Sequence, residues 1–110
     1  MNSLPPPLPV VRAIAKLGSD LALARRRRMI SQHSLAERTG ASISTIKRLE
    51  AGDLRVPLHF VARALFVLGE IDRLAQLLDT AVDDVGLNLM DERLPKRIRQ
   101  PRAGLKDHAL

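Results

Sequence analysis

Apolar residues recur at helical spacing through the middle of the chain. Between about residues 11 and 28, Leu17 and Leu21 share one helical stripe with Arg25 and Arg28. The same spacing unites two later groups, which are Val61, Ala64, Leu65 and Leu68, then Ile71, Leu74, Leu77 and Leu78. These patterns predict helices over about residues 11–28, 58–68 and 71–78.

Two shorter helices are predicted between the first and second of these stripes. Ser31 and Ser42 are good N-caps, because a serine hydroxyl accepts a hydrogen bond from the unpaired N–H groups of a first helical turn. Gly40 tolerates the left-handed conformation that commonly ends a helix. The expected helices are 32–39 and 43–50, joined by a tight turn, with Ile46 and Leu49 facing inward.

Outside these helices the sequence changes character. Residues 1–10 are rich in proline and predict a flexible arm, whereas residues 81–110 contain prolines and many charges and predict a tail. One alternative inside this tail is that residues 85–90 pair as a β-strand. The expected fold is therefore all-α, with a five-helix domain over residues 11–80, an N-terminal arm and a basic C-terminal tail.

Composition narrows the class of function. The 110 residues are 45% hydrophobic, which suits one domain, and the absence of cysteine excludes disulfides and thiolate chemistry. The net charge is +6. Basic residues outnumber acidic ones in residues 1–31 and 91–110, whereas acidic residues slightly outnumber basic ones in residues 32–90. Basic regions of this kind favour a polyanionic partner. Because only two residues are aromatic, stacking on single-stranded bases is disfavoured.

The outward face of the predicted helix 43–50 carries the most informative chemistry. If Ile46 and Leu49 face inward, then Ile43, Ser44, Lys47 and Arg48 face outward, so the face is short, polar and basic. A helix of this kind suits the major groove of DNA. The alternative is that this face is ordinary solvated surface.

The sequence around this helix resembles the helix-turn-helix of the Cro/C1 repressor-like (XRE) family, whose pattern is SQ-x-x-LA-x-x-x-G-x-S-x-x-x-I-x-x-LE-x-G. The matching residues are Ser31, Gln32, Leu35, Ala36, Gly40, Ser42, Ile46, Leu49, Glu50 and Gly52. The resemblance covers about residues 14–69. One departure is Thr39, at a position that is usually apolar in the family.

This resemblance implies specific roles. Ile43, Ser44, Lys47 and Arg48 are expected to contact bases, with Arg48 suited to guanine and Ile43 to a thymine methyl group. Phosphate contacts are expected from Gln32, at the start of its helix, and from Arg55.

A structural role is expected for Arg25. It lies on an apolar stripe and needs a partner, and Glu50 matches the family position that pairs with an arginine of the first helix. We therefore expect an Arg25–Glu50 salt bridge. The other arginines of the run 25–28 spread around a helical turn, and phosphate contacts are favoured for them.

No residue pattern indicates an enzyme. The three histidines have no metal-ligand spacing, and the adjacent carboxylates Asp83 and Asp84 fall in an expected turn. We therefore expect no catalytic residues, no metal and no cofactor. No apolar run is long enough to span a membrane, and the N-terminus does not resemble a signal peptide, so the expected compartment is the cytoplasm.

The C-terminal stretch carries a second, less specific resemblance. The sequence from Val85 to Arg99 resembles the end of HipB-like antitoxins, which are XRE proteins partnered with HipA-like kinase toxins. Leu87, Leu89 and Leu94 are surplus to the five-helix core, which is consistent with partner or dimer contacts. The alternative is a basic tail that adds phosphate affinity through Arg93, Lys96, Arg97 and Arg99.

Together these features predict a DNA-binding transcriptional repressor. It is expected to bind double-stranded DNA as a homodimer on a roughly palindromic operator, with a HipA-like kinase toxin as a possible partner. A stand-alone or phage-type regulator without a toxin is the alternative. An RNA-binding protein is disfavoured by the scarcity of aromatic residues.

Overall fold

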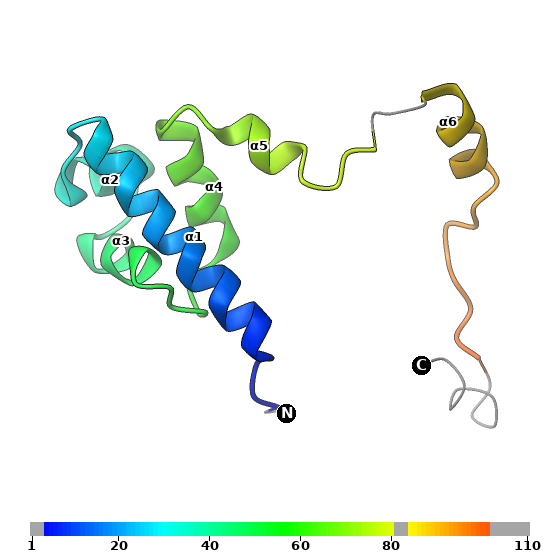
Figure 1. Cartoon of the computed structure of the whole chain (residues 1–110), viewed down its shortest axis with the longest axis horizontal. Helices are drawn as coiled ribbons and strands as arrows, with labels where there is room; N and C mark the ends of the chain where they lie inside the picture. Colours follow the sequence, from blue (N-terminus) through cyan, green and yellow to red (C-terminus); the bar gives the residue numbers. More distant parts are fainter. Residues whose placement is uncertain (1–3, 81–83, 102–110) are drawn as a thin grey trace. The chain divides into compact units, whose positions relative to one another are not determined.

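The described residues are entirely helical or irregular, as the sequence predicts. The computed structural model describes residues 4–80 and 84–101. Its helices are α1 (Leu8–Arg27), α2 (Gln32–Thr39), α3 (Ile43–Glu50), α4 (Leu58–Val67), α5 (Ile71–Ala75) and α6 (Asp84–Glu92). The chain divides into two units, residues 1–77 and residues 78–110. Figure 1 shows α1 to α5 in the first unit and α6 in the second.

The boundaries of α1 and α5 differ from the sequence-based expectation. Helix α1 begins at Leu8, so the expected arm loses its last three residues to the helix. Pro9 does not prevent this, because the first turn of a helix needs no N–H partner. Helix α5 ends at Ala75 instead of near residue 78, which leaves Leu77 and Leu78 exposed.

The second unit corrects another expectation. Residues 84–92 form helix α6, so the alternative of a β-strand over residues 85–90 is wrong. No strand occurs in the described ranges that could pair with such a segment. Beyond α6 the chain is irregular from residue 95 to residue 101.

Two buried clusters hold the first unit together. The larger cluster joins α1, α3 and α4 through Leu21, Leu49, Val61, Ala64 and Leu68. The smaller joins α2 to α3 through Leu35, Ala36 and Ile46. Helix α3 therefore contributes to both clusters, and its back is fixed against three other helices.

The contact between α1 and α3 depends on Gly18. A Cβ atom at this position would lie 2.5 Å from the carbonyl oxygen of Leu49 and 2.7 Å from that of Glu50. Only glycine allows the α1 backbone to approach the end of α3 this closely. The absence of a side chain at residue 18 thus determines how closely the C-terminal end of α3 packs against α1.

Thr39, which departs from the family pattern, is accommodated without an unsatisfied polar group. Its side chain is buried, and its hydroxyl donates to the carbonyl oxygens of Leu35, at 2.8 Å, or Ala36, at 3.1 Å. Because a buried hydroxyl with a partner avoids most of its desolvation cost, the threonine fits in the core.

Candidate nucleic-acid interface

Helices α2 and α3 are each built by a serine cap. The Ser31 hydroxyl accepts from the backbone N–H of Ser34 at 3.0 Å, and the Ser42 hydroxyl accepts from that of Thr45 at 3.1 Å. Between the helices, Gly40 adopts φ 71°, the left-handed conformation expected of it. These local interactions form two short helices separated by a tight turn.

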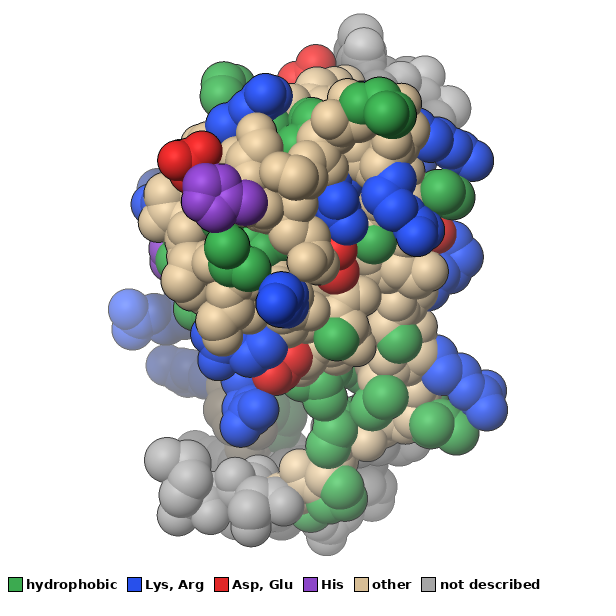
Figure 2. Space-filling view, turned by 90° about the vertical axis from the view of Figure 1, so that its left-hand side faces the viewer, with side chains coloured by type: hydrophobic (Ala, Val, Ile, Leu, Met, Phe, Trp, Pro, Cys, Tyr) green, Lys and Arg blue, Asp and Glu red, His purple; other side chains and the backbone are tan. Residues whose placement is uncertain are grey.

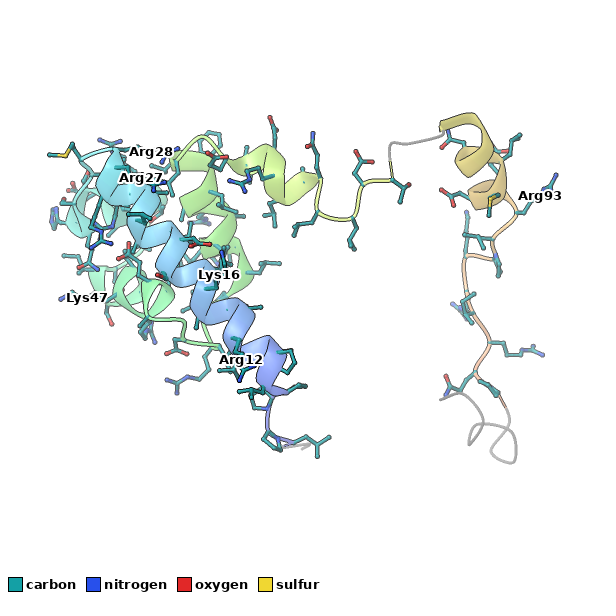
Figure 3. All side chains as sticks on the ribbon, in the orientation of Figure 1. Arg12, Lys16, Arg27, Arg28, Lys47 and Arg93 are labelled. Carbon is teal, nitrogen blue, oxygen red and sulfur yellow. The ribbon has the colours of Figure 1, made fainter. Side chains whose placement is uncertain are left out.

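Helix α3 is anchored on one side and exposed on the other. Ile46 has no exposed surface and Leu49 is buried, whereas Ser44, Lys47 and Arg48 are exposed. Figure 2 shows the face of the molecule around α2 and α3, over which Lys and Arg side chains are spread. In Figure 3, Lys47 lies at the outer edge of α3. The exposed side is thus polar and basic.

Ile43 lies differently from the other three candidates on this helix. It is half-buried and packs against the cluster formed by Leu35, Ala36 and Ile46. Only part of its side chain remains accessible to a ligand. Ile43 is the first residue of α3 and follows the loop from α2, so its side chain lies against the core.

Glu50 is held by a bidentate ion pair with Arg25. The Nε of Arg25 lies 2.6 Å from Oε2 of Glu50 and Nη2 lies 3.0 Å from Oε1. The remaining guanidinium nitrogen, Nη1, donates to the carbonyl oxygen of Ile30 at 2.8 Å. This is the pair expected from the sequence, and both side chains are almost fully buried.

Gln32, the expected phosphate contact, is tied to the same carboxylate. Its Nε2 donates to Oε1 of Glu50 at 3.0 Å. A carboxylate can only accept hydrogen bonds, so Glu50 sets which end of the amide faces inward and leaves the second Nε2 proton for another acceptor. The sequence alone does not predict this hydrogen bond, because it joins residues eighteen positions apart, one at the start of α2 and the other at the end of α3.

Arg55, the other expected phosphate contact, is engaged by Asp53. Its Nε and Nη2 each donate to a different Asp53 oxygen at 3.1 Å, and its backbone N–H donates to Oδ1 at 2.8 Å. These hydrogen bonds hold the pKa of Asp53 down to about 2 and raise the pKa of Arg55. The sequence signal was the aspartate two residues before the arginine, a typical Asx-turn spacing.

The remaining arginines of the run 25–28 do not share one environment. Arg28 donates to the carbonyl oxygen of Ala24 at 2.8 Å and to Glu70 at 3.3 Å, so it contacts the α4–α5 turn. Arg26 and Arg27 are exposed. Figure 3 shows Arg27 and Arg28 at the C-terminal end of α1.

The family comparison agrees with this geometry. A family model described as a helix-turn-helix domain matches residues 16–86, which is more than half of the chain. The chain belongs to the helix-turn-helix domain family. The match covers α2, the turn and α3, and it supports a DNA-binding regulator. No curated protein and no solved structure matches the chain.

Two further findings concern the described residues only. None of their histidine, aspartate or glutamate side chains form a group that could hold a metal ion. Their helices are all too short or too polar to cross a membrane.

Proposed function

We propose that this helix-turn-helix protein is a sequence-specific transcriptional repressor that reads the major groove with α3. The observation that carries the proposal is the two-sided environment of this helix. Ile46 and Leu49 anchor it from behind, while Ser44, Lys47 and Arg48 are free of the core. A helix held in this way can enter a groove without disturbing the fold.

The proposed roles of the exposed residues follow from their chemistry. Arg48 is suited to donate two hydrogen bonds to guanine, and Ser44 can contact several base edges. Lys47 supplies a further donor, and the accessible part of Ile43 can meet a thymine methyl group. The phosphate contact proposed for Gln32 uses its second Nε2 proton, since the first is donated to Glu50.

We also propose Arg55 as a phosphate contact, one that contributes less to DNA affinity than Gln32 does. Its guanidinium already donates to Asp53, whose negative charge also repels a phosphate. A phosphate that binds there must compete with this carboxylate. The contact is nonetheless exposed, so exchange of one anion for the other is sterically open.

The proposed assembly is a homodimer on a roughly palindromic operator. Two copies of α3 would then reach half-sites about 34 Å apart, one helical turn of DNA. An apolar groove of about 400 Å³ between α1, α4 and α5 supports self-association, because exposed apolar surface commonly marks an interface. Leu74 and Leu77 line it. Light scattering at increasing protein concentration tests this assembly.

The biological role that we propose is that of an antitoxin which represses its own operon and binds a HipA-like kinase toxin. Leu89 and Leu94 are exposed in the second unit and are available for partner contacts. Leu87 lies outside the residues whose side chains are described. A stand-alone or phage-type regulator is the alternative, and it needs the same α3 surface but no partner for these leucines.

Sequence selection from a random duplex pool tests the proposal at α3. Arg48→Ala should cost about 1–3 kcal/mol at one base pair of the selected site, because one bidentate contact is lost. Arg12→Ala removes the same charge from an exposed position on α1 and should preserve the base preference. Equal weakening of Arg48→Ala on selected and scrambled duplexes would contradict base reading.

A second experiment separates the two biological roles. If a kinase gene lies beside the gene for this chain, the two purified products should form a complex that lowers kinase activity. Leu89→Asp should weaken that complex without changing DNA affinity, because Leu89 lies outside the α3 surface and before the basic residues that follow α6. DNA binding together with no complex would favour the stand-alone regulator.

A further inference from the structure

The segment that follows α6 is irregular and exposed. It contains Pro95 and Pro101, and every residue from 93 to 101 is exposed. Proline removes a backbone donor and disfavours both a helix interior and a central strand. From residue 95 on, the segment therefore presents its side chains on an irregular backbone instead of a helical face.

The basic side chains of this segment form no ion pair with any of the residues that the structure describes. Within the described residues, no carboxylate pairs with Arg93, Lys96, Arg97 or Arg99. In the first unit, by contrast, Arg25, Arg28 and Arg55 each contact a carboxylate. Unpaired positive charges that lie close together along a chain attract a polyanion.

The backbone conformation decides which surface of a polyanion this segment fits. The major groove of DNA admits a helix, whereas the minor groove is only about 6 Å wide. A narrow A·T-rich minor groove has an enhanced negative potential that attracts arginine. An irregular segment with three arginines and one lysine matches the minor groove better than the major groove.

The connection to the helix-turn-helix is long enough for both parts to contact one duplex. Eight residues, 76–83, separate α5 from α6, and a chain of that length spans at most about 29 Å. Helix α6 adds about 13 Å, because each helical residue rises about 1.5 Å. The basic segment can therefore reach DNA beyond the base pairs that α3 covers.

We propose that residues 93–99 form a second DNA-binding element, which enters the minor groove of the A·T-rich DNA that flanks the site of α3. The proposal rests on the proposed function, since α3 positions the chain on the duplex. Arg97 and Arg99 supply the groove contacts, while Arg93 and Lys96 contact neighbouring phosphates. The two elements together extend the bound sequence beyond a single major-groove contact.

The test uses the full chain and duplexes that share one α3 site but differ in flanking sequence. Wild-type protein should bind a duplex with A·T-rich flanks about tenfold more tightly than one with G·C-rich flanks. Arg97→Ala/Arg99→Ala should abolish this preference. Arg97→Lys/Arg99→Lys should also abolish it but retain the dependence of affinity on salt, because lysine keeps the charge and lacks the planar guanidinium.

Arg12→Ala/Lys16→Ala is the matched control, since it removes two positive charges from α1, where Figure 3 shows both residues. This variant should keep the flank preference. Thermal melting of each variant shows whether the fold is intact, which we expect because residues 97 and 99 are exposed and lie outside both buried clusters.

Several outcomes would overturn the minor-groove proposal. No flank preference in the wild type, or full preference in the lysine variant, shows that the segment does not read the minor groove. If Arg97→Ala/Arg99→Ala lowers affinity equally for the A·T-rich and G·C-rich duplexes, the segment contacts phosphates only. If the variant weakens only the binding of a protein partner, the segment is a protein-binding element. The proposed function fails separately, if scrambling the α3 site leaves affinity unchanged while the flank preference persists.

Discussion

Glu50 accepts hydrogen bonds from two other helices and is the residue on which the interface most depends. Arg25 of α1 and Gln32 of α2 both donate to it, and it ends α3. A buried carboxylate of this kind is tolerated because each oxygen is matched by a donor. The same side chain therefore joins the fold of the domain to the orientation of an expected phosphate contact.

Removing this carboxylate should strongly lower stability. Glu50→Ala leaves the guanidinium of Arg25 buried and unpaired, which typically costs about 3–5 kcal/mol. Urea denaturation measures the change in the free energy of unfolding. The control Lys16→Ala breaks an ion pair that is exposed to solvent and should cost less than about 1 kcal/mol. Similar costs for both variants would mean that the Arg25–Glu50 pair has no special role.

At Asp53 a single charge is expected to limit DNA affinity. Asp53→Asn keeps the oxygen that accepts the backbone N–H of Arg55 but removes the charge that engages its guanidinium. We expect DNA affinity to rise several-fold and the salt slope to steepen by about one, because Arg55, once free of the carboxylate, neutralises one more phosphate and releases its counterion. Fluorescence anisotropy over a range of salt concentrations measures both; an unchanged slope would exclude Arg55 as a phosphate contact.

The hydrogen bonds between Arg55 and the carboxylate of Asp53 persist at neutral pH. The pKa of Asp53 is lowered, so the stabilisation is present above the ordinary aspartate pKa and is lost only as the pH falls from about 4 through about 2. An NMR titration of the Asp53 carboxyl group follows this transition. A midpoint near 4 would mean that the hydrogen bonds from Arg55 are absent in solution.

At the scale of helices, the sequence predicted α2, the turn and α3 well, because their determinants are local. Ser31, Gly40 and Ser42 act within four residues of their own position. The contact between α1 and α3 was not predicted, since Gly18 sits inside a helix, where local rules regard glycine only as a weak helix former. Glycine is required at residue 18 because the backbone of α3 lies too close for a side chain.

Gly18→Ala therefore tests whether the contact between α1 and α3 outweighs helix propensity in its effect on stability. In an exposed helix this substitution would stabilise by about 1 kcal/mol. Here the added Cβ would meet two carbonyl oxygens, so we expect a destabilisation of at least about 1–3 kcal/mol. Thermal denaturation provides the measurement, with Ser19→Ala as an exposed neighbour on the same helix. A more stable Gly18→Ala protein would show that α1 and α3 are less close than described.

At the scale of the whole chain, all the residues of the two buried clusters lie within the first unit. The second unit carries the basic residues 93–99, which are expected to act through DNA. The first unit therefore contains both buried clusters and the α3 surface, whereas the second unit contributes no residue to either cluster.

A chain that ends at Leu77 should fold with nearly the stability of the full protein. It retains α1 to α5 and every residue of both clusters, so we expect the free energy of unfolding to change by less than about 1 kcal/mol. Urea denaturation of the truncated and full chains makes the comparison. A loss of several kcal/mol would mean that residues 78–110 contribute to the core.

The sequence by itself determined the helices, their caps, the tight turn and the outward chemistry of Ser44, Lys47 and Arg48, because periodicity and capping act over a few residues. Only the tertiary structure decided that Gln32 is oriented by Glu50, that Ile43 is partly withdrawn into the core, and that Arg28 faces Glu70. These outcomes depend on side chains from different helices meeting in space. No local pattern encodes the distance between two helices, which follows from how closely their surfaces pack.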